Sequence, residues 1–302
     1  HDQYRPRGVP VVYRGRLGRI THDALAGKAV VAVNDVNNDT GETLRGHIKI
    51  RDLARGFTDK EGNAISVIEN CSVEFEPGLL NVVMGKSGCG KSTLAYMGAG
   101  YLKPDRGSIE IDGREVIEPG PDRIMVFQET ALWPWMTVTD NVIFGPLARN
   151  ALPRSEAREK AEDLLERFGL IDFKDKYPAQ LSGGMKRRAE IAQALINSPD
   201  IMILDEPFRG LDVMTRELLQ EYYLQLYEDT QLTTLFITSE LEEALFLADR
   251  LYVMTEAPNN IDQVIEIDLP RPRSFEVTAT EQYLDLKQIA MNHLYAGAEE
   301  LM

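Results

Sequence analysis

Cysteine, histidine and tryptophan are scarce in this sequence of 302 residues, which contains two, four and two of them respectively. Cys71 and Cys89 cannot form a disulfide framework, and so few cysteines are typical of a reducing compartment. No run of about 18 apolar residues occurs, which argues against a helix that spans a bilayer. Basic residues are the minority, 33 against 48 acidic ones, and the formal net charge of −15 disfavours a nucleic-acid-binding protein.

The overall composition is that of a globular protein, with 43% hydrophobic and 27% charged residues, which excludes a disordered or collagen-like chain. The length suggests roughly two domains. Residues 1–45 lack clear periodicity and are interpreted as an N-terminal extension. Five arginines within it carry positive charge, namely Arg5, Arg7, Arg14, Arg16 and Arg19. The extension is either a solvated segment or a contact for a partner or anionic lipid.

Strand and helix patterns alternate from about residue 47 onward. Short apolar runs predict strands at 48–53, 72–75, 80–84, 124–127, 201–204, 234–238 and 251–254. Helical patterns are found at 91–100, 154–168, 183–197, 212–228 and 240–248. Strands that alternate with helices predict an α/β fold with a largely parallel sheet.

Two segments depart from this alternation. Residues 138–197 are rich in helical pattern and contain no convincing strand, which predicts a helical subdomain inserted in a core domain at 46–270. Residues 271–302 form a C-terminal tail, which starts with a linker-like break at Arg271-Pro272-Arg273 and contains one amphipathic helix at about 280–295.

A glycine-rich loop follows the strand at 80–84 and precedes the helix at 91–100. Residues 85–93 read GKSGCGKST, which fits the phosphate-binding pattern G-x-x-x-x-G-K-[ST] in its strand–loop–helix context. Glycines allow successive backbone N–H groups to face phosphate oxygens, and the helix N-terminus adds positive potential. The residues predicted to bind the nucleotide are Gly85, Ser87, Gly88, Gly90, Lys91, Ser92 and Thr93. Lys91 would contact the β- and γ-phosphates and Ser92 would bind Mg²⁺; the alternative is a glycine-rich turn without a ligand.

Two acids, Asp205 and Glu206, end the apolar strand at 201–204. Ligands of open α/β sheets lie at the carboxyl ends of the strands. Asp205 is therefore predicted to hold Mg²⁺, and Glu206 to polarise the water that attacks the γ-phosphate. The alternative is a pair of solvated strand-terminal acids.

Three further motifs resemble those of ABC-type ATPases. Leu-Ser-Gly-Gly-Met at residues 181–185 resembles the family's signature motif, Gln128 its Q-loop and Gly210-Leu211-Asp212 its D-loop. Their order and spacing agree with the family over about residues 47–270. The resemblance implies a P-loop NTPase core of ABC ATPase type with a helical subdomain.

A subfamily is also suggested by several segments. The signature ends in Met, and residues 133–135, 242–250 and 267–273 look like those of the nitrate/sulfonate/taurine/bicarbonate class of importer ATPases. The resemblance implies an ATPase at the cytoplasmic face of the membrane that powers import of a small anionic or organic solute. It implies a transmembrane permease, a second ATPase subunit and a solute-binding protein as partners, and no nucleic acid.

The resemblance also implies a mechanism in which ATP closes a head-to-tail dimer. Ser182, Gly183 and Gly184 would cap the γ-phosphate from the other subunit, and the D-loop residue Asp212 belongs to the same nucleotide site. Gln128 would contact Mg²⁺ and the attacking water.

Aromatic residues supply two further candidates. Phe57 is the candidate to stack on adenine, or alternatively packs in a hairpin. Residues 129–136 are expected in a groove for a permease helix, although Trp133 and Trp135 could be core residues instead.

The sequence departs from the family where a switch histidine is expected, because Ser239 occupies that position. A hydroxyl can donate one hydrogen bond but lacks the reach and titration of an imidazole. Ser239 supports slow hydrolysis, or the chain pairs with an intact second ATPase, or the nucleotide acts mainly as structural glue. Arg187 and Gln193 also differ, because the subfamily usually has Gln and Arg there.

Three classes of function follow from these observations. The leading interpretation is the ATP-hydrolysing subunit of a membrane importer. The second is a nucleotide-gated assembly protein with weak hydrolysis. The third, a soluble ABC ATPase that acts on DNA or ribosomes, is disfavoured by the acidic charge and by the single ATPase core.

Overall fold

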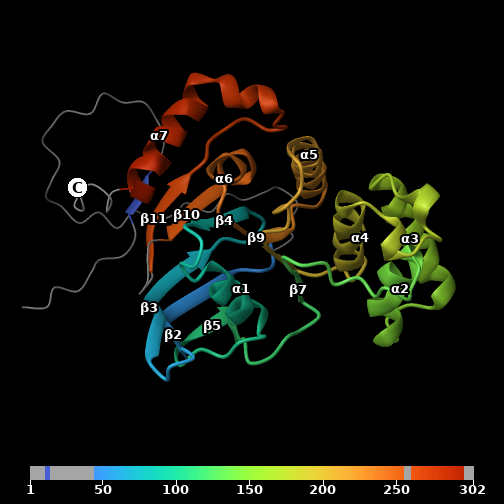
Figure 1. Ribbon diagram of the computed structural model, residues 1–302, viewed down its shortest axis with the longest axis horizontal. Coiled ribbons are helices and arrows are strands. Elements are labelled where there is room, and N and C mark those ends of the chain that lie inside the picture. Colours follow the sequence, from blue (N-terminus) through green and yellow to red (C-terminus); the bar gives the residue numbers. More distant parts are fainter. Residues whose placement is uncertain (1–10, 14–43, 255–259, 296–302) are drawn as a thin grey trace, which may run out of the picture.

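The computed structural model describes residues 11–13, 44–254 and 260–295. The extension's five arginines therefore lie outside the described residues. The described part holds two sheets, with helices packed against and beside them (Figure 1). None of its helices combines the length and the apolar character needed to cross a bilayer.

The larger sheet has seven strands in the order β1-β11-β10-β4-β9-β8-β7. All neighbouring pairs are parallel except β10 and β11. The strands are β1 Val11–Tyr13, β4 Leu80–Gly85, β7 Arg123–Val126, β8 Ile201–Asp205, β9 Thr233–Thr238, β10 Arg250–Met254 and β11 Ile261–Glu266. Every residue of β4, β8 and β9 is buried, as expected for strands covered on both faces. The prediction of a largely parallel sheet is confirmed.

The smaller sheet is antiparallel, with the order β3-β2-β5-β6, and the sequence did not predict it as a separate layer. Its strands are β2 Ile48–Thr58, β3 Ala64–Phe75, β5 Arg106–Ile111 and β6 Arg114–Glu115. Register shifts and the positive φ of Asp52 and Asn70 interrupt the alternation along β2 and β3. The apolar pattern is therefore broken into shorter pieces than the strands themselves.

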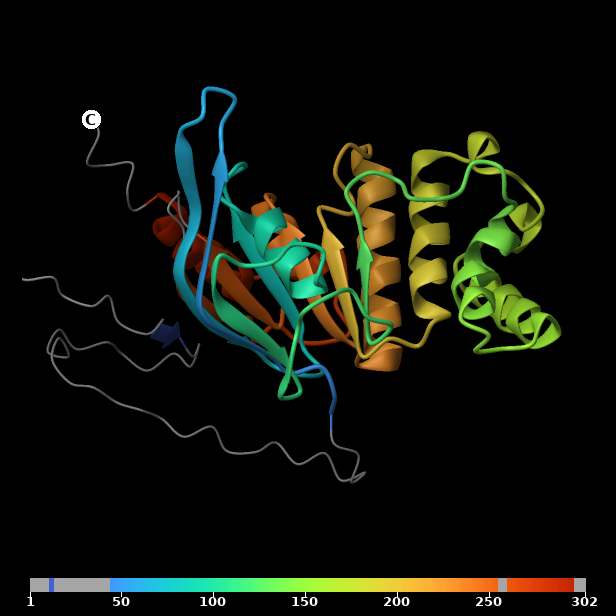
Figure 2. The same ribbon diagram turned by 90° about the horizontal axis from the view of Figure 1, so that it is seen from below.

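Helices pack against both faces of the larger sheet and beside its β7 edge (Figure 2). They are α1 Lys91–Ala99, α2 Val138–Ala148, α3 Arg154–Arg167, α4 Gly183–Leu195, α5 Val213–Thr230, α6 Leu241–Leu247 and α7 Glu281–Tyr295. Short 3-10 turns lie at Ile171–Phe173, Pro178–Gln180 and Phe275–Ala279. Helix α1 lies between the two sheets, whereas α6 and α7 cover the opposite face of the larger one (Figure 1).

Two cores result from this layering, one on each face of the larger sheet. Along β4 the side chains alternate between them, because Val82 and Met84 belong to the core with α5 and α6, and Val83 to the core with α1. Helices α2, α3 and α4 extend beyond the β7 edge of the sheet (Figure 2). The division of the chain into domains stays a prediction.

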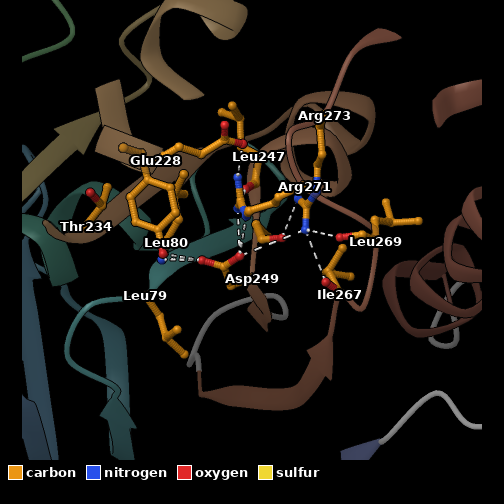
Figure 3. Close-up of polar contacts among 12 residues, drawn as sticks. Leu79, Leu80, Glu228, Thr234, Leu247, Asp249, Ile267, Leu269, Arg271 and Arg273 are labelled. Carbon is orange, nitrogen blue, oxygen red and sulfur yellow. Dashed lines mark hydrogen bonds and ion pairs between the residues drawn. The ribbon is translucent and has the colours of Figure 1, made fainter. Parts of the chain in front are cut away.

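A polar cluster joins the C-terminal segment to the amino end of the larger sheet (Figure 3). Arg271 donates to Asp249 Oδ1 through Nε at 3.0 Å and Nη2 at 2.6 Å, while the Leu80 amide donates to Oδ2 at 2.9 Å. Arg273 is buried and donates to four carbonyls, those of Phe246, Ala248, Ile267 and Leu269. The expected linker-like break at this point is therefore wrong, because these arginines anchor the segment to the core.

Candidate nucleotide site

Four predicted site segments come together at one edge of the larger sheet. Strands β4, β9, β8 and β7 are adjacent and parallel, so their carboxyl ends share that edge. The glycine-rich loop follows β4, Ser239 follows β9, the acids end β8, and Gln128 follows β7 closely. Sheet order thus collects residues as far apart in sequence as Gly85 and Ser239, which is the usual arrangement of ligand sites in such folds.

The glycine-rich loop leads directly into α1. Gly90 is the N-cap of this helix with φ 97°, a left-handed conformation that favours glycine, and no side chain caps the helix. The first N–H groups of α1 are consequently available to an anion. Gly85 packs so closely that a Cβ would collide with the Met254 carbonyl oxygen. Ser87 and Gly88 are exposed on the loop, and Thr93 is half-buried in the first turn.

Lys91 is buried beneath this loop. Its ammonium donates to the carbonyl oxygens of Gly85 at 2.8 Å and Lys86 at 2.9 Å, and lies 4.0 Å from Cys89 Sγ. Within the described residues its hydrogen-bond partners are neutral, so the positive charge is held without a carboxylate at contact distance. A phosphate oxygen would be a stronger partner than either carbonyl.

Ser92 and Asp205 link the loop to the end of β8. Ser92 Oγ donates to Asp205 Oδ1 at 2.9 Å. Burial raises the pKa of the Asp205 carboxyl, and the Ser92 hydrogen bond and the Lys91 charge oppose this shift. A hydroxyl and a carboxylate in contact suit Mg²⁺, which takes oxygen ligands. No group of three or more His, Cys, Asp or Glu forms a metal centre in the described part, so phosphate and water oxygens would complete the coordination.

Glu206 lies next to Asp205 with a strained backbone. Its φ is 42°, and its N–H donates to the Ile237 carbonyl at 2.9 Å, which ties it to β9. Strained non-glycine residues cluster at functional sites. Arg209 Nη1 donates to Glu206 Oε2 at 2.6 Å, from a side chain that is about half exposed. The sequence interpretation missed Arg209, although its spacing of three residues from the acid was visible.

Ser239, at the position of the switch histidine, and Gln128, the Q-loop residue, follow the two strands that flank β8 and its acids. Ser239 is half-buried directly after β9. Gln128 is exposed, and its backbone carbonyl accepts a 2.6 Å hydrogen bond from Arg187 Nη2 of α4. Both residues follow strands whose carboxyl ends form the edge where the other segments meet.

The signature residues form a second group, away from the glycine-rich loop of the same chain. Ser182 is the N-cap of α4 and accepts from the Met185 amide at 3.3 Å, while Asp212 is the N-cap of α5 and accepts from the Thr215 amide at 3.0 Å. Hydrogen bonds from the Thr215 hydroxyl, at 2.7 Å, and from the Thr215 amide lower the pKa of the Asp212 carboxyl.

The two helix N-termini are neighbours. A Cβ on Gly184 would lie 2.5 Å from Thr215 Cγ2, and Gly183 is exposed beside them. Helix α4 lies on the far side of β7 from α1 in both ribbon views (Figures 1 and 2). The structure therefore does not bring Ser182, Gly183, Gly184 and Asp212 to the glycine-rich loop of their own chain.

The aromatic candidates are exposed. Phe57 lies near the end of β2 at 41% exposure, with the Arg55 guanidinium 5.0 Å from its ring centre. Trp133 and Trp135 are 38% and 67% exposed, and Trp133 contacts both Trp135 and Phe144. The alternative that these tryptophans are core residues is wrong.

Comparisons with known proteins agree on one family. Residues 68–209 match the family described as ABC transporter. The bicarbonate transport ATP-binding protein CmpD of Synechocystis sp. is 44% identical over 251 residues, which cover 82% of this chain and 89% of that protein. The nitrate import ATP-binding protein NrtD of Synechococcus elongatus is 43% identical over 231 residues, which cover 76% of this chain and 84% of that protein.

Solved structures share the fold. A dimeric, post-hydrolysis state of the ATP-binding cassette MJ0796 bound to ADP and Pi has a TM-score of 0.65 and 26% sequence identity. The similarity covers 76% of this chain and all of that chain.

Proposed function

Because this chain belongs to the ABC transporter family of ATP-binding proteins, we propose that it binds ATP with Mg²⁺ and couples hydrolysis to import of a small anion. The observation that carries the proposal is the shared sheet edge, where Lys91, the Ser92–Asp205 contact and Glu206 lie at the carboxyl ends of the parallel strands β4 and β8, on either side of β9. Such a concentration of opposite charges suits a triphosphate and its cation.

Each residue at this edge has its own role in binding or hydrolysis. Loop amides and the Lys91 ammonium bind the β- and γ-phosphates, and Lys91 exchanges carbonyl partners for phosphate oxygens. Ser92 and Asp205 hold Mg²⁺, which neutralises charge on those oxygens. Glu206 accepts the proton of a water whose oxygen attacks the γ-phosphorus, while the bond from that phosphorus to the β–γ bridging oxygen breaks. Gln128 orients the same water, and Phe57 stacks on the adenine.

A second copy or a related subunit completes the site. Ser182, Gly183, Gly184 and Asp212 lie at helix N-termini away from the glycine-rich loop, and Ser182, Gly183 and Asp212 are exposed. Helix N-termini attract anions, so a head-to-tail partner would present them to the γ-phosphate. The dimeric state of the similar cassette MJ0796 supports this arrangement.

The names of the relatives suggest the solute and the remaining partners. CmpD is a bicarbonate transport protein and NrtD a nitrate import protein, both small oxyanion systems. We assign this chain to the cytoplasmic face of the membrane as the peripheral partner of a permease that is supplied by a solute-binding protein. The exposed Trp133, Trp135 and Phe144 form the aromatic face that we assign to a permease helix.

The proposal is tested with the full chain, purified alone and together with its permease. Calorimetry should detect Mg²⁺-dependent binding of ATP, and vesicles that hold the complex should accumulate nitrate or bicarbonate only with ATP. Trp135→Ala should weaken association with the permease and leave nucleotide binding intact. Absence of Mg²⁺-dependent affinity for ATP, with the permease present, contradicts the proposal.

A second candidate function rests on Ser239. If the hydroxyl at this position supports little turnover, ATP binding would organise an assembly and hydrolysis would be marginal. The proteins that co-purify with the chain distinguish the two candidates, because a permease indicates an importer and a large assembly without a permease indicates the alternative.

A further inference from the structure

A buried ion pair lies on α4, just beyond the signature residues. Arg187 Nη1 donates to Glu190 Oε2 at 2.8 Å, and the two residues are only 7% and 5% exposed. They are separated by three positions on one helix, so their side chains project toward the same side. Charges this deeply buried require compensation by further hydrogen bonds.

That compensation comes from the backbone that surrounds Gln128. Arg187 donates to the carbonyls of Phe127 at 2.7 Å and Gln128 at 2.6 Å. Glu190 Oε1 accepts from the amide of Ala131. The ion pair thus binds backbone groups of the segment 127–131 at both of its ends. We refer to these four hydrogen bonds, the ion pair included, as the α4 clasp.

The planar guanidinium matters for this geometry. Arg187 donates to two carbonyls and a carboxylate from two separate nitrogens of its planar guanidinium, a spacing of donors that the compact ammonium of lysine does not provide. Within the part of the chain that the structure describes, the backbone groups that these two side chains bind all belong to the segment after β7.

We propose that Arg187 and Glu190 are positioning residues for Gln128, because their clasp joins the segment 127–131 to the signature helix as one rigid body. This inference rests on the proposed function, in which Gln128 orients the attacking water. Ser182 is five residues before Arg187 on the same helix, about 7 Å along its axis. Any displacement of α4 when its N-terminus meets the γ-phosphate therefore moves Gln128 with it.

The same rigid body includes the start of the aromatic face. Asn141 of α2 accepts from the Trp133 amide at 2.7 Å and donates to the carbonyls of Trp133, Met136 and Thr137. Gln193 of α4 donates to the Asn141 carbonyl at 3.0 Å. The segment from Gln128 to the tryptophans is therefore fixed to α4 at both ends.

Three glutamine variants of the full chain, two single and one double, separate positioning from mere stability, and Arg187→Lys is a fourth variant. Arg187→Gln and Glu190→Gln each leave one buried charge without its partner, so both should lower the melting temperature. The double variant removes both charges and should recover most of that loss. It still lacks the clasp, so its kcat should stay about tenfold below that of the wild type, with KM for ATP within about twofold. Arg187→Lys should not restore kcat.

Hydrogen exchange of the nucleotide-free chain supplies a readout that does not depend on activity. Peptides that cover 127–131 should exchange at least several-fold faster in all three variants, whereas peptides of the glycine-rich loop should not change. Arg273→Gln is the matched control, because it also removes a buried arginine from backbone carbonyls. It should lower the melting temperature without altering kcat or exchange at 127–131.

Two results overturn the proposal. One is recovery of kcat together with melting temperature in the double variant, which would make the pair purely structural. The other is unchanged exchange at 127–131 in Arg187→Gln. If the wild-type chain with its permease shows no ATP turnover, the proposed function fails instead, and the exchange data still report whether the clasp exists.

Discussion

The two ends of the larger sheet hold polar clusters that look alike in composition and differ in how their groups are satisfied. At the carboxyl end, Lys91 rests on two carbonyls of its own loop, and Glu206 meets the half-exposed Arg209. At the amino end, Asp249 receives hydrogen bonds from Arg271 and the Leu80 amide. The first cluster keeps partners that a ligand can replace, whereas in the second the counter-charge of Asp249 comes from Arg271 of the chain itself.

Burial disfavours the charged form of a side chain at each end of the sheet, and the consequences differ. Burial lowers the pKa of Arg273 to about 10, which still leaves the guanidinium charged at neutral pH and dependent on its four carbonyls. Burial raises the pKa of Asp205, which makes a nearby cation more favourable. A cluster of charged residues therefore indicates a ligand site only where a ligand can replace the hydrogen-bond partners of those residues.

The largest expected effect breaks the carboxyl end alone. Glu206→Gln removes the proton acceptor and keeps the side-chain size, so kcat for ATP should fall about 10³-fold. ATP should still bind, because Lys91 and the loop are unchanged. Phosphate release and binding of a fluorescent nucleotide measure the two properties. A kcat within tenfold of the wild type would show that another group accepts the proton.

The second prediction breaks the amino end alone. Asp249→Asn leaves the Arg271 guanidinium without its carboxylate, so the free energy of unfolding should fall by about 3 kcal/mol. The affinity for ATP should not change, because the glycine-rich loop lies at the other end of β4. Urea unfolding and calorimetry measure both. Weaker ATP binding in a fully folded variant would mean that the two ends are coupled.

The third prediction sharpens the description of the carboxyl end. Ser239→His places an imidazole after β9 and should raise kcat about tenfold, a modest fraction of what general acid–base groups contribute. Steady-state ATP turnover measures the effect, with Ser239→Ala as the control. An unchanged kcat would indicate that this position does not face the γ-phosphate.

The smallest expected effect tests how much one hydroxyl contributes to the stability of the amino-end cluster. The Tyr227 hydroxyl lies 2.6 Å from Asp249 Oδ2 and 2.7 Å from the Gly78 carbonyl. Tyr227→Phe keeps the ring and loses this hydroxyl, so unfolding should become easier by about 1 kcal/mol. Thermal unfolding without nucleotide provides the measurement. A loss as large as that of Asp249→Asn would place the hydroxyl, rather than the arginine, at the centre of the cluster.

Much of the parallel sheet and the family could be predicted from the sequence. Continuous apolar runs such as 201–204 occur where a strand is buried on both faces, and the structure places Ile201–Asp205 there. The family assignment from the glycine-rich loop, the paired acids and the signature motif is confirmed. These signals are local, because each motif is contiguous in the chain. The roles of the individual site residues stay predictions.

The features that the sequence did not predict depend on distant partners. Arg187 was visible as a departure from the subfamily, but its role became apparent only from the carbonyls of Phe127 and Gln128, about 60 positions away. Arg271 and Arg273 suggested a linker because Pro272 lies between them, whereas most of their acceptors, at residues 246–249, are more than 20 residues upstream, near α6. Side-chain to backbone pairs over such separations leave no periodic pattern.

The polar cluster at the amino end of the sheet also has a consequence for the order in which its residues are synthesised. Asp249 joins the start of β4 to α5, and its arginine partner is made more than 190 residues after the Leu80 amide that it also binds. Chains emerge from the ribosome amino end first. The nucleotide-binding half of the sheet is therefore translated well before its last counter-charge, and a nascent chain that ends between residues 249 and 271 carries Asp249 without the guanidinium that pairs with it.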